Sequence, residues 1–316
     1  MKTCIKTIIA VGLSITLLGG ILFTIGYANA KRTQKAIVNT YEISEEFGDF
    51  DITLTTANLE FKASEDGTTK VVCKETENLT HAVSVVDNTL TIKASDKTKW
   101  YENAFNFSFL QCKITVYVPT EHIGFNVKID ATTGDVNLPK GFEFSSVNIK
   151  MSTGDANIGA TIKGNLKVKN TTGTVTVSES SCKTAEFTAS TGDIKLNSFT
   201  VDETLNISTT TGDIKLNNVN CGSLTVDVST GDVKLIDTVA SGNMQITATT
   251  GDVRFDNADA NSLKIKTSTG NVTGSLKTGK KFVCDTSVGD IRVPNTDGGV
   301  CEIKTSTGDI IITIKE

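Results

Sequence analysis

Hydrophobic and polar residues alternate through most of this 316-residue sequence, and the alternation recurs with a longer period. The recurrence is clearest in residues 205–216, LNISTTTGDIKL, whose pattern returns nine more times around a glycine, always 19 or 20 residues from the last. A fixed period of this length is typical of solenoids and other repeat architectures. The ten glycines are Gly134, Gly154, Gly173, Gly192, Gly212, Gly231, Gly251, Gly270, Gly289 and Gly308.

Within each repeat, apolar residues stand seven and five positions before the glycine and two positions after it. The position four after the glycine is also apolar, with Gly274 as the exception. Alternation with a period of two, rich in Val, Ile and Thr, predicts strands, whereas a helix would need a period near 3.6. Each repeat is therefore expected to form a strand, a Thr-Gly-Asp corner, a second strand and a short return loop.

One repeat cannot bury its own apolar face, but stacked repeats bury it in continuous columns. The predicted fold class is all-β: a parallel β-solenoid (a single-stranded β-helix or roll) of about ten coils with an irregular β cap at its N-terminal end. We expect the glycine to take a positive φ at the corner and the next residue to bond nearby backbone amides. The aspartates at these predicted structural corners are Asp135, Asp155, Asp193, Asp213, Asp232, Asp252, Asp290 and Asp309.

Residues 1–30 differ from the rest of the chain. Lys2 and Lys6 precede an apolar run over residues 8–28, and Ala-Asn-Ala follows at 28–30. This pattern predicts either a secretory signal peptide cleaved after Ala30 or an N-terminal membrane anchor. Both alternatives place the body of the protein outside the cytoplasm.

Residues 31–40 are polar and predict a linker, and residues 41–125 predict an irregular β cap that includes decayed coils. Asn58 stands where later repeats carry Asp, and residues 83–94 predict a hairpin around Asp87-Asn88. Residues 97–109 are rich in aromatic side chains, which suits either a cap insertion or a contact surface for a partner or the membrane. The aromatic residues of that candidate surface are Trp100, Tyr101, Phe105, Phe107 and Phe109.

Regular coils are predicted over residues 126–316, and the chain ends in Ile-Ile-Ile-Thr-Ile-Lys-Glu with no capping helix. An uncovered last coil would leave backbone groups unpaired, so we expect self-association through this C-terminal edge.

The net charge of −5 gives no electrostatic basis for nucleic-acid binding. Among the seven cysteines, Cys182 and Cys221 occupy one column but are two coils apart, about 9.6 Å, which is too far for a disulfide. Cys73 and Cys112 are not constrained by the pattern, and we expect mostly free thiols. With no C-x-x-C pair, no metal site is predicted, and no cofactor is expected.

The stacked aspartates could form a row of calcium-binding sites. Lysines and arginines two positions further along the chain offset their charge, however, so we favour a purely structural role for these corners. Every repeat also has Ser or Thr two positions before the glycine. This hydroxyl file suggests polysaccharide or ice recognition, or simply a strand-stabilising ladder, and we favour the ladder because one file is narrow. A carbohydrate-cleaving β-helix would need one distinguished pair of carboxylates, which identical repeats do not provide, so we expect no enzyme activity.

The tandem S/T-T-G-D-V/I-x-L units behind one apolar segment resemble the bacterial putative-adhesin family, β-solenoid domains of unknown function found in LiaG-type cell-envelope proteins. The resemblance covers residues 41–316 and implies a surface-exposed or membrane-attached solenoid associated with envelope stress. Thr174, Asn271 and Val288 depart from its pattern as corner variants.

Two functions follow as expectations. The first is a non-catalytic, adhesin-like or structural rod that presents a binding face to a cell-envelope polymer or another surface. The second is an accessory protein in envelope-stress signalling, anchored by residues 8–28 and contacting a membrane protein through the cap. A carbohydrate-binding or carbohydrate-cleaving β-helix is a lesser alternative.

Overall fold

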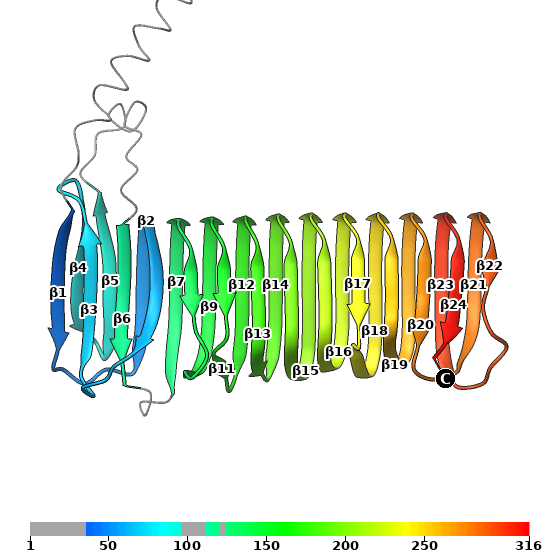
Figure 1. Ribbon diagram of the computed structural model, residues 1–316, viewed down its shortest axis with the longest axis horizontal. Coiled ribbons are helices and arrows are strands. Elements are labelled where there is room, and N and C mark those ends of the chain that lie inside the picture. The colour runs from blue at the N-terminus through cyan, green and yellow to red at the C-terminus, as the bar shows by residue number, and fades with distance from the viewer. Residues whose placement is uncertain (1–35, 97–111, 120–123, 316) are drawn as a thin grey trace, which may run out of the picture.

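The computed structural model describes residues 36–96, 112–119 and 124–315, which form 24 strands of one wound sheet and no helix (Figure 1). The strands of the N-terminal region are β1 (Ile37–Ile43), β2 (Asp49–Ala63), β3 (Thr69–Glu75), β4 (Leu79–Val86), β5 (Thr89–Asp96) and β6 (Cys112–Val118). The strands of the coils are β7 (Phe125–Thr133), β8 (Val136–Leu138), β9 (Glu143–Thr153), β10 (Ala156–Ile158), β11 (Thr161–Ile162), β12 (Asn165–Thr172), β13 (Val175–Cys182), β14 (Thr184–Thr191), β15 (Ile194–Thr211), β16 (Ile214–Thr230), β17 (Val233–Ile236), β18 (Val239–Thr250), β19 (Val253–Thr269), β20 (Val272–Leu276), β21 (Lys280–Val288), β22 (Ile291–Arg292), β23 (Gly299–Thr307) and β24 (Ile310–Ile314).

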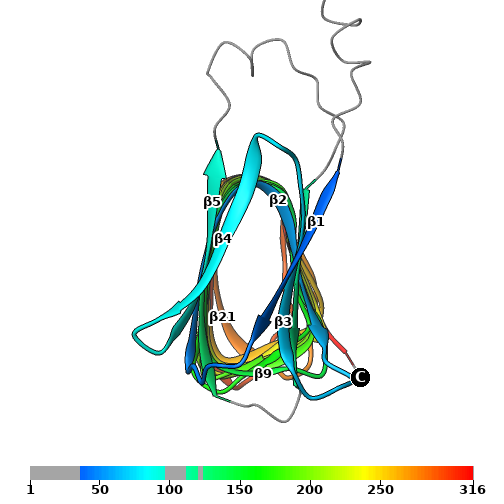
Figure 2. The ribbon, with the colours of Figure 1, turned by 90° about the vertical axis from the view of Figure 1, so that its left-hand side faces the viewer.

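The coils stack in parallel with equivalent repeat positions opposite one another. In the pairing of β15 with β16, Ile194 lies opposite Ile214 and Leu205 lies opposite Leu224. The ten glycine corners delimit about nine turns. This arrangement confirms the predicted parallel β-solenoid, and Figure 2 shows its coils superposed along the stack.

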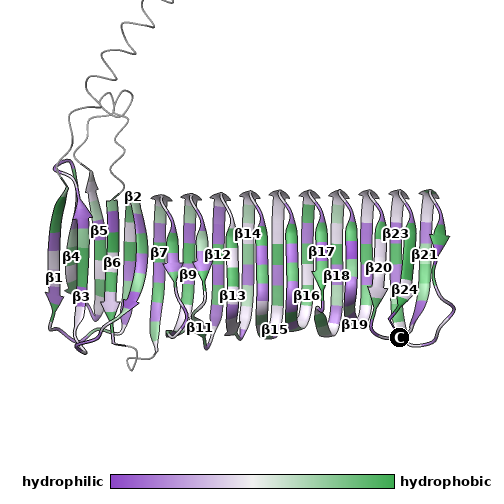
Figure 3. Ribbon diagram, viewed as in Figure 1, coloured by the Kyte–Doolittle hydropathy of each residue, from purple (hydrophilic) through white to green (hydrophobic). Residues whose placement is uncertain are grey.

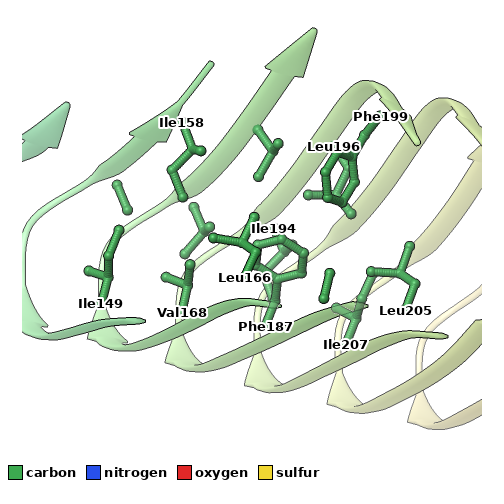
Figure 4. Close-up of a cluster of buried hydrophobic side chains, with 14 of the residues drawn as sticks. Ile149, Ile158, Leu166, Val168, Phe187, Ile194, Leu196, Phe199, Leu205 and Ile207 are labelled. Atoms are coloured by element: carbon green, nitrogen blue, oxygen red, sulfur yellow. The ribbon is translucent and has the colours of Figure 1, made fainter. Parts of the chain in front are cut away.

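The core consists of the apolar columns that the alternation predicts. Phe187, Ile194, Phe199 and Leu205 are each fully buried, and the rings of Phe187 and Phe199 meet edge to face at 6.1 Å between centroids. Figure 4 shows these side chains pointing into the interior from two walls of the coil. The outward residues between them are mainly polar, which gives each strand the banded hydropathy seen in Figure 3.

Five successive coils also have a second tight turn, which the repeating glycine pattern does not signal. The first corner of each of these coils is a glycine such as Gly212, with φ +143°. The second corner is a residue other than glycine that still adopts a positive φ, between 46° and 60°. The residues at this second corner in five successive coils are Glu179, Ser198, Asn218, Asp237 and Asn257. Asn and Asp tolerate this conformation better than other non-glycine residues, which accounts for three of the five.

The N-terminal end is closed by antiparallel strands. Strand β3 pairs antiparallel with both β1 and β6, while β2 pairs in parallel with β5, β6, β7 and β8 and so joins the cap to the first coil. The predicted hairpin is confirmed, because β4 and β5 pair antiparallel around Asp87 and Asn88, both with positive φ. The predicted linker, residues 31–40, overlaps β1, which begins at Ile37 because it pairs with β3.

The C-terminal strands do not form the end of the rod, which corrects the location expected for the open edge. Strand β23 lies between β19 and β21, with Cys301 opposite both Leu263 and Phe282, so the last coil in sequence is the second to last in space (Figure 1). The uncovered coil is β21–β22. A physical reason is visible in the two sequences: Ile310 and Ile312 are buried in the interior coil, while Pro294, which lacks a backbone donor, follows the outer one.

None of the described residues forms a helix long and apolar enough to cross a membrane. The predicted signal peptide or anchor, residues 1–30, lies outside the described residues.

Candidate functional site

The corner aspartates connect one coil to the next through the backbone. The Asp213 carboxylate accepts the backbone N–H of Asp232 at 2.9 Å, and the backbone N–H of Asp213 itself donates to Asp193 at 3.1 Å. Asn271 acts in the same way, accepting the N–H of Asp309 at 2.9 Å. Asn58, in the predicted decayed copy, likewise accepts the N–H of Asp135 at 2.9 Å. One side-chain oxygen of each of these corner residues is therefore engaged in the stacking of the coils.

The other carboxylate oxygen pairs with a base in several coils. Lys195 lies 3.0 Å from Asp193, and Arg254 lies 2.6 Å from Asp252 and 3.7 Å from Asp232. Partial burial raises the pKa of Asp193, but the hydrogen bond from the backbone of Asp213 and the Lys195 ammonium outweigh it and hold the pKa below its usual value. At Asp193, Asp232 and Asp252, these bases offset the charge of the corner carboxylate.

The hydroxyl file is wider than the sequence suggests. The residues one and two positions before each corner glycine are both exposed, because the chain leaves the strand alternation as it turns. Parallel register stacks them, with Thr211 opposite both Thr191 and Thr230. We call this surface the hydroxyl flank. It comprises Thr132, Thr133, Ser152, Thr153, Thr171, Thr172, Ser190, Thr191, Thr210, Thr211, Ser229, Thr230, Thr249, Thr250, Ser268, Thr269, Ser287, Ser306 and Thr307, with Val288 as its one apolar member.

The open end of the rod exposes apolar side chains. Val283, Val288 and Ile291 are 51%, 64% and 44% exposed, and all three belong to the outermost coil. Self-association through the open edge stays a prediction. The edge that would take part is β21–β22, and not residues 310–316 as the sequence suggested.

The candidate aromatic contact surface lies outside the described residues. Its five members, Trp100 to Phe109, fall within residues 97–111.

The six cysteines in the described part of the chain are all free thiols, as expected for most of them. Cys182 and Cys221 are separated by Val201 in the strand register, which puts them two coils apart. Burial raises the pKa of each of these two thiols to about 12, so neither is a reactive nucleophile at neutral pH.

Sequence reasoning missed one group of candidate functional side chains, in the cap. Cys73, Glu75 and His81 are all buried, and their potential ligand atoms lie within 4.8 Å of one another. The strand alternation places Cys73 and Glu75 on one face, but only the return of the chain in β4 brings His81 to them. The signal available in the sequence was Glu75, an acidic residue at a strand position that the alternation directs inward.

The family described as Toastrack DUF4097 matches residues 47–237 and 218–316. A solved structure of a protein described as a putative adhesin from Parabacteroides distasonis is 16% identical, with a TM-score of 0.51, and the alignment covers 85% of this chain and 97% of that one. A putative adhesin from Parabacteroides merdae is 15% identical, with a TM-score of 0.52, covering 76% and 96% of the two chains. At this identity the likeness shows the fold alone. Among curated proteins, none matches this chain in sequence.

Proposed function

This chain belongs to the Toastrack DUF4097 family, and from that premise we propose that it is a non-catalytic, extracytoplasmic, adhesin-like rod whose hydroxyl flank binds a cell-envelope polymer. The observation that carries the proposal is the flank itself: two adjacent files of exposed hydroxyls, stacked in register over all ten corners and interrupted only at Val288. The putative-adhesin descriptions of the structural relatives agree with a surface role.

The chemistry of the flank suits a long polymer with hydrogen-bonding groups along its length. Hydroxyls stacked about 4.8 Å apart offer both donors and acceptors at every coil. A single exposed hydrogen bond contributes only about 0.5–1.5 kcal/mol, because water competes for both groups. Many equivalent contacts along one rigid rod add through multivalency, so the affinity depends on the length of the flank.

The corner chemistry supports a role without catalysis. Sugar hydrolysis needs two positioned carboxyl groups with different protonation states. The corner carboxylates instead accept backbone N–H groups of the neighbouring coil, as Asp213 does from Asp232. They act as part of the scaffold that holds the hydroxyl files in register.

Cosedimentation of the full-length protein with purified peptidoglycan sacculi tests the proposal. The variant Thr210→Val, Ser229→Val, Thr249→Val removes three hydroxyls from adjacent coils and places β-branched valine, which favours strands, at all three positions. We expect its affinity for sacculi to fall by at least about tenfold, from three lost hydrogen bonds at about 0.5–1 kcal/mol each.

The matched control, Thr200→Val, Thr204→Val, Ser241→Val, removes three exposed hydroxyls outside the flank and should bind as the wild type does. Failure of the wild-type protein to sediment with the polymer, or equal loss of binding in both variants, would refute the role of the flank. Release of soluble sugar fragments during the incubation would contradict the absence of catalysis.

The extracytoplasmic location rests on the sequence of residues 1–30, with its lysines, apolar run and Ala-Asn-Ala. Intact-mass measurement of the protein from cells distinguishes its two forms: a mature chain beginning at Lys31 indicates a cleaved signal peptide, and retention of residues 1–30 indicates an anchor. The role as an anchored accessory in envelope-stress signalling stays a prediction, since the segments that would carry it, 8–28 and 97–109, lie outside the described residues.

A further inference from the structure

The cap contains a buried cluster of three side chains that commonly ligate metals. Cys73 and Glu75 point inward from β3, and His81 points inward from β4, after the short connection at residues 76–78. Their relative exposures are 0%, 1% and 3%, so the cluster is enclosed. Two hydrogen bonds, from Thr76 N–H to the Leu79 carbonyl and from Leu79 N–H to the Thr76 hydroxyl, hold the connection between the strands.

The hydrogen bonds of the cluster orient its donors. Glu75 accepts the Asn39 amide at 2.6 Å, the His81 backbone N–H, and a contact of 2.9 Å from His81 Nδ1. Tyr41 donates to the His81 carbonyl at 3.1 Å. The other ring nitrogen, His81 Nε2, is buried and has no hydrogen-bond partner among the described residues. Since Nδ1 is the nitrogen that faces Glu75, it is the ring atom that could share a metal ion with that carboxylate.

We propose that Cys73, Glu75 and His81 form a zinc site that stabilises the N-terminal cap. Thiolate, imidazole and carboxylate are the ligand types that zinc takes in proteins, and three protein ligands leave the fourth tetrahedral position for water. The proposal is independent of the hydroxyl flank, because it concerns only the cap.

The charges of this ligand set balance inside the protein. A divalent cation bound by one thiolate, one carboxylate and one neutral imidazole gives a buried group of zero net charge. The three side chains are enclosed by the cap, with relative exposures of 0–3%, so the charge of any group bound there is shielded from water. Burial favours a group of zero net charge over an uncompensated one.

The geometry requires only a small contraction. Donor atoms on one tetrahedral zinc lie about 3.5 Å apart when the bonds are 2.0–2.3 Å long. The three potential ligand atoms already lie within 4.8 Å of one another, so the side chains need to close by about 1 Å. The Asn39 amide on Glu75 would serve as the outer partner that orients a ligating carboxylate.

Cobalt(II) titration of the full-length protein, stripped with chelator in detergent solution, tests the proposal. We expect one equivalent of cobalt to produce tetrahedral ligand-field bands and a thiolate-to-cobalt charge-transfer band, and zinc to displace both. Cys73→Ser should remove the charge-transfer band. Asn39→Ala should keep the band but weaken cobalt binding by about 10- to 100-fold, the usual effect of losing an outer partner.

Cys182→Ser is the matched control, since Cys182 is a similarly buried free thiol in a coil far along the chain, and it should leave the titration unchanged. Absence of a thiolate–cobalt band in folded wild-type protein would overturn the proposal without any variant. A band that persists in Cys73→Ser would also overturn it, because the metal would then bind another thiol.

Discussion

The corner glycines are the positions where a single methyl group should have the largest effect on the solenoid. Gly212 has φ +143°, and a Cβ built on it would lie 2.1 Å from the carbonyl oxygen of Gly192 in the neighbouring coil. That oxygen is part of the backbone and is surrounded by sheet hydrogen bonds, so it cannot move aside without separating the two coils. Gly212→Ala therefore tests whether close backbone approach is what requires glycine at the corner.

The expected magnitude has two contributions. The backbone conformation, which only glycine readily adopts, costs about 1–3 kcal/mol for alanine. The overlap with a well-packed neighbour costs about 1–3 kcal/mol more. Gly67 is the matched control, since its φ is +72° but a Cβ there would meet nothing within 4 Å. Gly67→Ala should lose only about 1–2 kcal/mol, from the left-handed conformation.

Urea unfolding of the full-length protein, followed by far-ultraviolet circular dichroism, measures both free-energy changes. Amide hydrogen exchange adds a local reading, because the coils of a solenoid can open separately. For Gly212→Ala we expect a loss of about 2–6 kcal/mol and faster exchange in residues 194–230. Equal losses in the two variants, or unchanged exchange around Gly212, would refute the steric explanation.

Three further outcomes follow from the same structure. Asp213→Ala should cost about 1 kcal/mol in urea unfolding, because its interstrand hydrogen bond is lost, while Asp213→Asn should be nearly neutral, as Asn271 accepts the same bond. Phe187→Ala should cost about 3–5 kcal/mol, since the ring is fully buried. The hydrogen bond from Lys113 lowers the pKa of Glu60 below its usual 4.5, so the stability it contributes is present above that pH and is lost as the pH falls through the folded-state pKa. Glu60→Gln should therefore flatten the acid side of the stability profile.

Each of these outcomes has a result that would contradict it. An Asp213→Asn variant as unstable as Asp213→Ala would show that charge, rather than the accepted hydrogen bond, matters at the corner. A small loss for Phe187→Ala would mean that the coil collapses around the missing ring. An unchanged acid profile for Glu60→Gln would show that the Lys113 pair has no net effect on stability.

The regular part of the solenoid could be predicted from the amino-acid sequence alone. The period of 19 or 20 residues, the inward columns and the glycine corners all follow from local alternation and turn chemistry, which act within one repeat and recur in every copy. The hairpin at Asp87 and Asn88 was predictable for the same reason, because a two-residue turn is a local signal.

Features that depend on contacts between distant segments could be seen only in the folded chain. The insertion of β23 and β24 between β19–β20 and β21–β22 reverses the order of the last two coils, and repeats of similar sequence do not specify their stacking order. The second hydroxyl file emerged where the chain turns away from strand alternation. The meeting of Cys73, Glu75 and His81 required the path of the cap, where antiparallel pairing brings two strands together and no repeat guides the reading.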